Sequence, residues 1–248
     1  MTVTQEDLDT ITNRCFVFDV DGTLTPSRGK IDAEFSKFFF DFCTLNHVYL
    51  VTGSDRSKTI EQIGNVLYGM SRRVYNCSGN SVWEKGVNVY NNDWKLDDEP
   101  WKYLESVLLY NRFEPKTGWH FDERPGLINF SIVGRRANAR QRKMYVEWDT
   151  KNSERSFIAN QFNERFKEKY GVTAQVAGET GLDIIQTGKG KQQILNDLSH
   201  YDSVIFFGDK CEVGGNDYDI SQAVQKLPNG IVYPVTGWQH TYNILKRK

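Results

Sequence analysis

FVFDVDGTLT, residues 16–25, is the most informative segment of this 248-residue chain. It continues an apolar run, Cys15–Phe18, which is typical of a central parallel strand that is covered on both faces. Asp19 and Asp21 follow at the carboxyl end of that strand, where ligands of open α/β sheets bind. Residues two apart in an extended chain project to the same side, so we expect the two carboxylates to lie together, and Gly22 then allows a sharp turn.

Two neighbouring carboxylates repel each other, at a cost of about 4 kcal/mol for a separation of ~4 Å and an effective dielectric constant of ~20. A hard cation such as Mg²⁺ offsets this repulsion and keeps coordination positions for a substrate phosphate. One Asp can then stay ionised and attack phosphorus, while the other holds a proton for the leaving oxygen. The alternative interpretation is a strand followed by an acidic turn.

The same ten residues closely resemble the first motif of the haloacid dehalogenase superfamily, whose members form a phospho-aspartate. This resemblance implies that Asp19 is the nucleophile and that Asp21 is the general acid/base. The motif alone does not choose among phosphatases, mutases and other phosphotransferases.

Composition limits the partners and the compartment. The 31 basic and 32 acidic residues give a formal net charge of −1, which argues against a nucleic-acid-binding protein and favours a small ligand. The four cysteines are scattered, with no Cys-X-X-Cys pair, as is usual in a reducing cytosol. No apolar stretch approaches the ~20 residues of a membrane span, and residues 1–13 are too acidic and polar for a signal peptide. We therefore expect a soluble cytoplasmic protein without a membrane partner.

Both ends of the chain alternate between strands and helices, which predicts a doubly wound parallel sheet. Asp32 is a candidate cap for a helix whose four phenylalanines follow an i, i+3, i+4, i+7 pattern and are expected in the core. The other expected strands cover residues 48–51, 73–77, 203–207 and 231–233, and helices are expected around residues 60–67, at 191–198, after 216 and at the end of the chain.

The middle third has a different pattern. Period-two segments such as residues 126–133 are interleaved with helical stretches at 101–110 and 154–170, which indicates an antiparallel sheet backed by helices. The predicted fold class is therefore α/β: a haloacid dehalogenase-like catalytic core formed by residues 1–86 and 187–248, with an inserted α+β cap domain at residues 87–186 that determines substrate specificity.

More polar residues are expected at the carboxyl edge of the core sheet. Asp209 follows the strand at 203–207, and together with Asn216 or Asp217 it could supply oxygen ligands to a metal ion. The alternative for Asp217 is a cap on the next helix.

Thr52 and Ser54 follow the second core strand and precede a helix, where hydroxyls and backbone N–H groups favour a phosphate. Their alternative is an ordinary helix cap, a function that Asp55 could also serve. Lys191 could steady a phospho-aspartate, or could be a solvated lysine.

Over nearly its whole length the chain is similar to eukaryotic-type phosphomannomutases. The matching stretches are residues 19–31, 53–55, 124–135 with Arg142, and 206–210 through 214–217. The stretch at 124–135 discriminates best, because it lies in the cap, where the superfamily diversifies.

The cap arginines suit a sugar that carries phosphate at each end in turn. Arginine binds phosphate in a planar, bidentate manner, so Arg124, Arg135 and Arg142, with Asn129 nearby, form a candidate second phosphate site. The alternatives for this basic run are a solvated surface and nucleic-acid binding, which the balanced composition disfavours. The resemblance adds Arg28 and Asp183 to the expected substrate contacts.

The resemblance implies interconversion of mannose 6-phosphate and mannose 1-phosphate through phospho-Asp19 and a hexose 1,6-bisphosphate, which also acts as activator. It further implies Mg²⁺ bound at Asp19, Asp21, Asp209, Asn216 and Asp217, and a homodimer formed through the caps. The alternative is a Mg²⁺-dependent sugar-phosphate phosphatase, because the family's Ser-Phe-Asp is here Gly181-Leu182-Asp183 and its Gly-Trp-Asp-Lys is Gly188-Lys189-Gly190-Lys191. The Asn-Gly turn after the third core strand is also altered. These departures lie in sugar-recognition and hinge regions, and leave the reacting groups unchanged.

Overall fold

The computed structural model describes residues 13–27 and 29–247. The chain forms two compact units. The first comprises the described residues up to Asn91, together with Gly190–Glu212 and the chain from Asp217 onward. The second comprises Asn92–Lys189 and Val213–Asn216.

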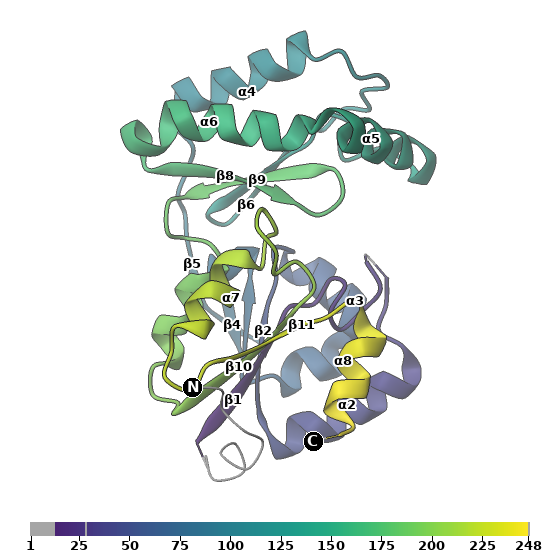
Figure 1. The fold of residues 1–248 in the computed structure, drawn as a ribbon, viewed down its shortest axis with the longest axis vertical. Coiled ribbons are helices and arrows are strands. Elements are labelled where there is room, and N and C mark those ends of the chain that lie inside the picture. The colour runs from purple at the N-terminus through teal and green to yellow at the C-terminus, as the bar shows by residue number, and fades with distance from the viewer. Residues whose placement is uncertain (1–12, 28, 248) are drawn as a thin grey trace. The chain divides into compact units, whose positions relative to one another are not determined.

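The first unit is built on a seven-stranded sheet with the strand order β11-β10-β1-β2-β3-β4-β5 (Figure 1). The strands from β11 to β3 are parallel to one another, as predicted. The bounds of the seven strands are β1 Arg14–Phe18, β2 His47–Val51, β3 Arg73–Asn76, β4 Ser81–Glu84, β5 Val87–Asn91, β10 Ser203–Gly208 and β11 Ile231–Pro234.

One edge of this sheet differs from the predicted all-parallel arrangement. Strands β4 and β5 form an antiparallel hairpin that continues the sheet beyond β3. The two residues between these strands, Lys85 and Gly86, both have positive φ (48° and 81°), which is the backbone of a tight hairpin turn. Strand β5 therefore belongs to the seven-stranded sheet, although the sequence pattern places it at the start of the insertion.

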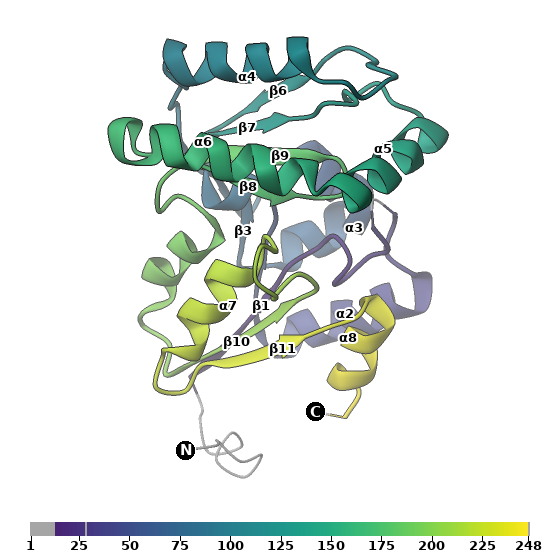
Figure 2. The same ribbon diagram turned by 45° about the horizontal axis from the view of Figure 1, so that its top comes forward.

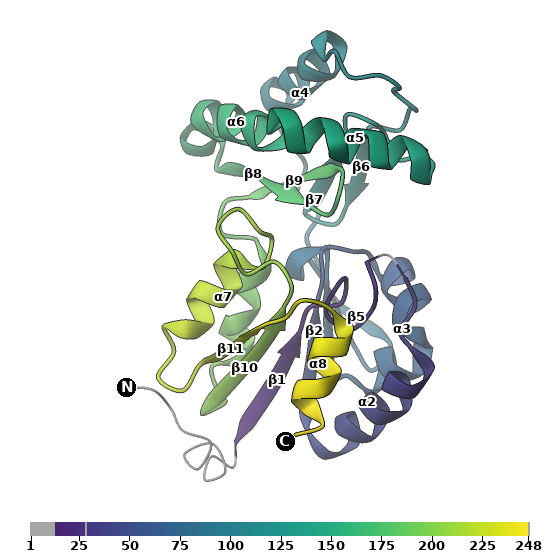
Figure 3. The ribbon, with the colours of Figure 1, turned by 45° about the vertical axis from the view of Figure 1, so that its right-hand side comes forward.

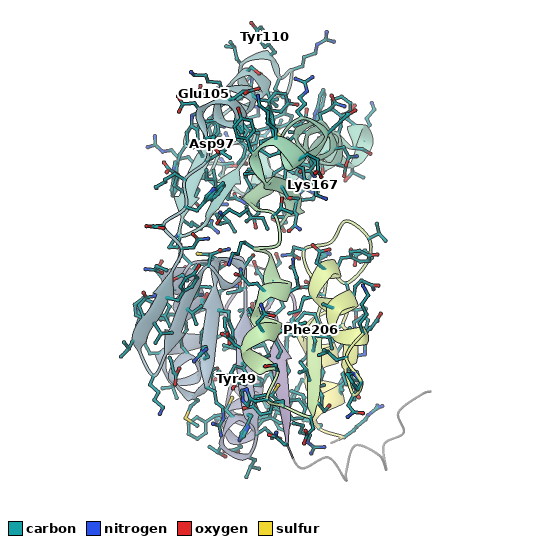
Figure 4. The ribbon with its side chains drawn as sticks, turned by 90° about the vertical axis from the view of Figure 1, so that its left-hand side faces the viewer. Tyr49, Asp97, Glu105, Tyr110, Lys167 and Phe206 are labelled. Carbon is teal, nitrogen blue, oxygen red and sulfur yellow. The ribbon has the colours of Figure 1, made fainter. Side chains whose placement is uncertain are left out.

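Helices cover both faces of this sheet (Figure 3). On one face, Phe16 and Phe18 of β1 pack with apolar residues of α2, α3 and α8, whereas Cys15 and Val17 pack with those of η2 and α7 on the other. Tyr49 and Phe206, both labelled in Figure 4, are buried on the side of η2 and α7. The bounds are α2 Ala33–Leu45, α3 Arg56–Met70, η1 Cys77–Gly79, η2 Lys191–Leu198, α7 Tyr218–Gln225 and α8 Trp238–Leu245.

Two predicted helices can be compared in detail. Asp32 caps α2 as expected, since its carboxylate accepts hydrogen bonds from the backbone N–H groups of Glu34 and Phe35. The helix expected at 191–198 is instead a 3₁₀ helix over exactly these residues, η2, which still buries Ile194 and Leu198. Ile194 and Leu198 pack on the face of the sheet that η2 covers, so the 3₁₀ helix keeps the expected packing.

The second unit contains a four-stranded antiparallel sheet with the order β6-β7-β9-β8, which confirms the antiparallel prediction. Apolar residues of α4, α5 and α6 pack on one face of this sheet (Figure 2), against Ile128, Phe130, Leu182 and Ile184. Strand alternation points the polar residues of β6, β7 and β9 to the opposite face. The bounds are α4 Asp98–Tyr110, β6 Phe121–Arg124, β7 Leu127–Phe130, α5 Ala139–Asn152, α6 Glu154–Tyr170, β8 Val172–Ala177 and β9 Gly181–Gln186.

The four cysteines are free thiols, and three of them are buried. Among the described helices, none has both the length and the apolar character needed to cross a bilayer.

Candidate active site

The candidate site of the first unit lies where the strand order reverses. Strand β1 pairs with β2 on one side and with β10 on the other, which is the position where open parallel sheets bind ligands. Asp19, Thr52 and Asp209 each come directly after one of these three strands. The backbone N–H of Asp19 donates to the carbonyl of Phe207 (2.9 Å), so the ladder between β1 and β10 extends to the first carboxylate.

Lys191 links two of the carboxylates. Its Nζ lies 2.6 Å from Oδ1 of Asp19 and 2.7 Å from Oδ1 of Asp217, and all three side chains are almost completely buried. Burial lowers the pKa of Lys191, but the two carboxylates outweigh burial, so the net effect is a pKa above its usual value. The ammonium group therefore stays protonated, which excludes the solvated lysine considered above.

Asp19, Asp209 and Asp217 form a compact acidic group. One carboxylate oxygen of each lies within 4.8 Å of the others. Burial raises the pKa of Asp19 well above its usual value, and the charges of Asp217 and Asp209 raise it further against the opposing effect of Lys191. Burial, with repulsion from Asp217, raises the pKa of Asp209 to about 6. The protein thus holds three carboxylates close together at a cost in free energy.

This donor set fits a divalent cation. Three carboxylates face two ammonium groups, the buried one of Lys191 and the exposed one of Lys210 at 3.8 Å from Asp209, so negative charge remains uncompensated when all three carboxylates are ionised. Carboxylate oxygens are the ligands that hard cations such as Mg²⁺ prefer. The carboxylate of Asp21 is not one of these three. Asn216 is half-buried and directly precedes Asp217.

Gly22 is required by the packing of the acidic group. Its φ is +86°, and a Cβ atom at this position would lie 2.4 Å from Oδ2 of Asp209. The glycine after the two aspartates therefore does more than turn the chain, because it also makes room for a carboxylate from a different strand.

Asp217 does not act as a side-chain cap. It occupies the position before α7, but its side chain makes no capping hydrogen bond there. Its Oδ1 instead accepts from Lys191, and its Oδ2 accepts from the backbone N–H of Lys210 (3.2 Å). The structure therefore decides between the two interpretations of Asp217 and assigns it to the acidic group.

Asp21 is held by a residue that the sequence pattern did not indicate. Nε2 of Gln62, in α3, donates to Oδ1 of Asp21 at 3.0 Å. The two residues are 41 positions apart, and Gln62 lies among the residues of an ordinary amphipathic helix, so no local signal marks it. Arg28, the other residue expected near this segment, lies outside the described residues.

Backbone hydrogen bonds link the loop after β2 to the loop after β3. The N–H of Ser54 donates to Oγ1 of Thr52 (3.1 Å), and the carbonyls of Thr52 and Ser54 accept from Ser78 and Cys77. Asp55 caps α3 by accepting from the N–H of Lys58 (2.8 Å). Neither Thr52 nor Ser54 is therefore needed as the helix cap.

In the second unit, two of the three predicted arginines share one carboxylate. Asp122 Oδ2 lies 2.5 Å from Nη2 of Arg124 and 3.2 Å from Nη2 of Arg135. Nη1 of Arg135 also donates to Oδ1 of Asn129 (3.1 Å), whose Nδ2 donates to Asp183 (2.7 Å). Burial lowers the pKa of Arg135, and so do the charges of Arg124 and Arg142. These six residues form the arginine cluster: Asp122, Arg124, Asn129, Arg135, Arg142 and Asp183.

The turn between β8 and β9 supports Arg142. The guanidinium group of Arg142 donates to Oγ1 of Thr180 (3.1 Å) and forms an ion pair with Glu179 (2.9 Å). Asp122, Glu179 and Thr180 were not predicted as site residues. For Asp122 a signal existed, since period-two alternation places it on the same side of β6 as Arg124.

Gly181 allows Asn129 to reach its partners. A Cβ atom at residue 181 would lie 2.6 Å from Nδ2 of Asn129 and 2.9 Å from its Oδ1. The position where the chain departs from the resembled family is therefore the one against which the Asn129 amide packs.

Comparison with solved structures identifies the fold. The C-terminal domain of trehalose-6-phosphate phosphatase from C. albicans superposes with a TM-score of 0.65 at 15% identity, over 96% of this chain and 92% of that chain. With the strand order and the carboxylates at the switch point, this likeness defines a haloacid dehalogenase-like α/β fold.

Comparison of sequences identifies the protein family. The model of a family described as eukaryotic phosphomannomutase matches residues 35–247, and the chain belongs to that family. A phosphomannomutase of Galdieria sulphuraria is 31% identical over 90% of this chain and 91% of its own length. A probable phosphomannomutase of Caenorhabditis elegans is 30% identical over 93% of this chain and 94% of its own length.

Proposed function

We propose that the protein is a phosphomannomutase that interconverts mannose 6-phosphate and mannose 1-phosphate. The observation that carries this proposal is the arginine cluster, in which Arg124, Arg135 and Arg142 gather around polar partners instead of lying separately on a solvated surface. A sugar whose reacting phosphate is at Asp19 needs a separate site for its other end. Guanidinium groups in such a cluster suit a phosphate dianion.

The chain's own groups account for both halves of the reaction. The carboxylate of Asp19 attacks phosphorus of a hexose 1,6-bisphosphate, the bond from phosphorus to the sugar oxygen breaks, and Asp21 gives its proton to that oxygen. In the reverse sense, Asp21 takes the proton of a sugar hydroxyl, whose oxygen attacks phospho-Asp19 and releases the carboxylate. A bisphosphate is therefore both intermediate and activator, since it primes Asp19.

Charge at the core site would be balanced by two kinds of cation. Mg²⁺ held by Asp19, Asp209 and Asp217, with Asn216 and the segment at Asp21 as further candidate ligands, would neutralise charge that develops on the transferring phosphoryl group. Lys191 supplies a fixed positive charge beside Asp19. Thr52 and Ser54 are candidate donors to the phosphoryl oxygens, and Arg28 and Asp183 are candidate sugar contacts.

The two units have different roles in this proposal. The unit that carries Asp19 is the catalytic core, and the unit that carries the arginine cluster is the cap that selects the substrate. Transfer to a sugar instead of to water requires that water be excluded from phospho-Asp19 while the sugar is bound.

The experiment that tests the proposal follows phosphorus by NMR. The protein is incubated with Mg²⁺, mannose 6-phosphate and a trace of hexose 1,6-bisphosphate. We expect mannose 1-phosphate to accumulate to equilibrium, and we expect Asp19→Asn to abolish it. If inorganic phosphate forms in stoichiometric amount while neither mannose nor glucose phosphates isomerise, the protein is a sugar-phosphate phosphatase and the mutase proposal is wrong.

We also propose that the protein is a homodimer formed through its second unit. Leu109 and Tyr110, at the end of α4, are 71% and 79% exposed, and Leu108 and Leu109 line a cavity of about 540 Å³ with Phe121 and His120. Tyr110 and Glu105 of this surface are labelled in Figure 4. Light scattering should show a dimer that Leu109→Glu dissociates, whereas the matched control Val66→Glu, on the first unit, leaves its mass unchanged.

The four free thiols support action in a reducing compartment such as the cytoplasm. Fractionation of the source cells should place the protein there.

A further inference from the structure

Gln62 is a buried polar residue on the inner face of α3, where Thr59 is also buried. Its neighbours on the inner side of α3, Ile63 and Leu67, belong to the hydrophobic core, and Gln62 itself is only 1% exposed. A buried amide is costly unless it makes hydrogen bonds. Nε2 of Gln62 makes two: it donates to Oδ1 of Asp21 at 3.0 Å and to Oγ1 of Thr25 at 3.2 Å.

These two contacts reach both ends of one turn. Asp21 and Thr25 are joined by a backbone bridge, and the N–H of Gly22 donates to the carbonyl of Thr25 (3.0 Å). Through these two hydrogen bonds, Gln62 links the side chain of Asp21 to the turn at residues 21–25.

The backbone of Gln62 is fixed as well. Its carbonyl accepts a hydrogen bond from the N–H of Ile31 (2.8 Å), and two residues later Gly64 has φ +78° and ψ 157°, which interrupts the regular helix. Because hydrogen bonds hold both the main chain and the side chain of Gln62, its amide has a defined direction toward Asp21.

One end of the amide remains unpaired. Oε1 of Gln62 is buried and accepts no hydrogen bond from the described residues. A buried acceptor without a donor is destabilising in a residue that serves only packing. The position of Gln62 is therefore better explained by its contact with Asp21 than by packing.

We propose that Gln62 is a positioning residue that orients the Asp21 carboxyl for proton transfer to and from the sugar oxygen. Its Nε2 occupies Oδ1 of Asp21 and thereby directs Oδ2 to the reacting oxygen. This inference rests on the proposed function in one respect, namely that Asp21 is the general acid/base. It holds equally for a mutase and for a phosphatase, since both begin by phosphorylating Asp19.

The test compares two phosphoryl donors in single-turnover phosphorylation of Asp19. A hexose 1,6-bisphosphate releases a sugar alkoxide and needs a general acid, whereas acetyl phosphate releases acetate, a weak base that leaves without a proton. The variant is Gln62→Met, which keeps the length of the side chain and removes the donor. We expect it to slow transfer from the bisphosphate by roughly 10- to 100-fold, within the range of general-acid contributions, and to leave transfer from acetyl phosphate within about twofold.

The matched control is Gln193→Met, because Gln193 donates to the carbonyl of Ser78 (2.8 Å) and its bond to that carbonyl involves neither Asp21 nor its turn. Any loss in this control should be equal for the two donors. Equal losses for the two donors in Gln62→Met, or no loss at all, would overturn the inference. Retained transfer from acetyl phosphate also reports that the variant is folded.

Asp21→Asn separates this inference from the proposed function. If Asp21→Asn slows both donors equally, Asp21 is not the general acid and the proposed mechanism itself fails. If Asp21→Asn slows only the bisphosphate while Gln62→Met slows neither donor, the mechanism stands and only the role of Gln62 is wrong.

Discussion

Nζ of Lys191 lies 2.6 Å from Oδ1 of Asp19, and the two side chains are 2% and 4% exposed. The same ammonium group also contacts Asp217, which is fully buried. A buried ion pair adds little to stability compared with an apolar pair of the same shape, but removing only one partner leaves an uncompensated charge in the interior. Lys191 is therefore needed for the fold, and the proposed reaction also uses its charge.

We expect Lys191→Met to destabilise the protein by about 3–5 kcal/mol, because the buried carboxylates of Asp19 and Asp217 lose the ammonium group that both contact. Urea unfolding in the absence of divalent cations measures this cost. Mutase activity should be lost even under conditions where the variant is folded.

Lys226→Met serves as the control for this variant, since Lys226 is exposed at the end of α7 and should change stability by less than about 0.5 kcal/mol. A cost below about 1 kcal/mol for Lys191→Met would show that the buried pair does not form in solution.

Much of the core site follows from local sequence. The apolar runs before Asp19, Thr52 and Asp209 predict buried parallel strands, and parallel strands bring their carboxyl ends to one edge of a sheet. Strands β1, β2 and β10 are neighbours in the structure, which confirms this expectation. The sequence could not decide whether Asp217 caps a helix, because the answer depends on Lys191, 26 residues away.

The parts that sequence reasoning missed depend on tertiary contacts or on weak periodicity. Gln62 contacts Asp21 across 41 residues, and only the packing of α3 against the β1 turn creates that contact. The sequence pattern predicts no helix at α5, because Arg140, Arg142 and Lys143 fill its first turns and Tyr145 is its one buried residue. The β4–β5 hairpin depends on a turn with positive φ at Lys85, a residue that seldom adopts it.

The arginine cluster predicts a specific loss of phosphate affinity. Arg135 contacts both Asp122 and Asn129, whereas its neighbour Arg136 is exposed. We expect Arg135→Ala to weaken binding of a hexose 1,6-bisphosphate by about 10- to 100-fold, which is the effect of removing a charge-assisted hydrogen bond. Calorimetry with the bisphosphate and with the neutral sugar measures the difference.

Arg136→Ala is the matched control, and its affinity for the bisphosphate should stay within about twofold. Equal losses for bisphosphate and neutral sugar in Arg135→Ala would instead assign Arg135 a structural role.

Gly181→Ala should disturb the arginine cluster through Asn129. The added Cβ would lie 2.6 Å from Nδ2 of Asn129, so the amide must move away from Asp183 and Arg135. We expect a stability loss of about 1–3 kcal/mol, as is usual for overpacking in a well-packed site, together with an increase in KM for the hexose phosphate.

A double-mutant cycle identifies the cause of the Gly181→Ala effect. If the collision with Asn129 is responsible, Gly181→Ala should cost at least 1 kcal/mol less in an Asn129→Ala background, because the colliding amide is gone. Costs that simply add would show that the alanine acts on the β9 backbone and not on Asn129.

The acidic group predicts how stability depends on pH and on Mg²⁺. Burial and Asp217 raise the pKa of Asp209 to about 6 from a model-peptide value of 3.8. A carboxyl group whose pKa is raised in the folded state binds more protons than the unfolded chain between these two values, so stability falls as the pH rises through this window. For Asp209 alone, the loss amounts to at most about 3 kcal/mol, and the raised pKa of Asp19 acts in the same direction.

Mg²⁺ should reverse this loss, since a bound cation favours ionised carboxylates. We expect the increase in Tm on adding saturating Mg²⁺ to be small at pH 5, where Asp209 is largely protonated, and substantially larger at pH 7.5, where Asp209 is ionised. Thermal unfolding with EDTA or Mg²⁺ at each pH measures both increments. In Asp209→Asn, which keeps the shape of the side chain but cannot ionise, the metal-free protein should lose less stability over the same pH range. An equal Mg²⁺ increment at both pH values in the unmodified protein would mean that the cation does not bind through Asp209 and its acidic neighbours.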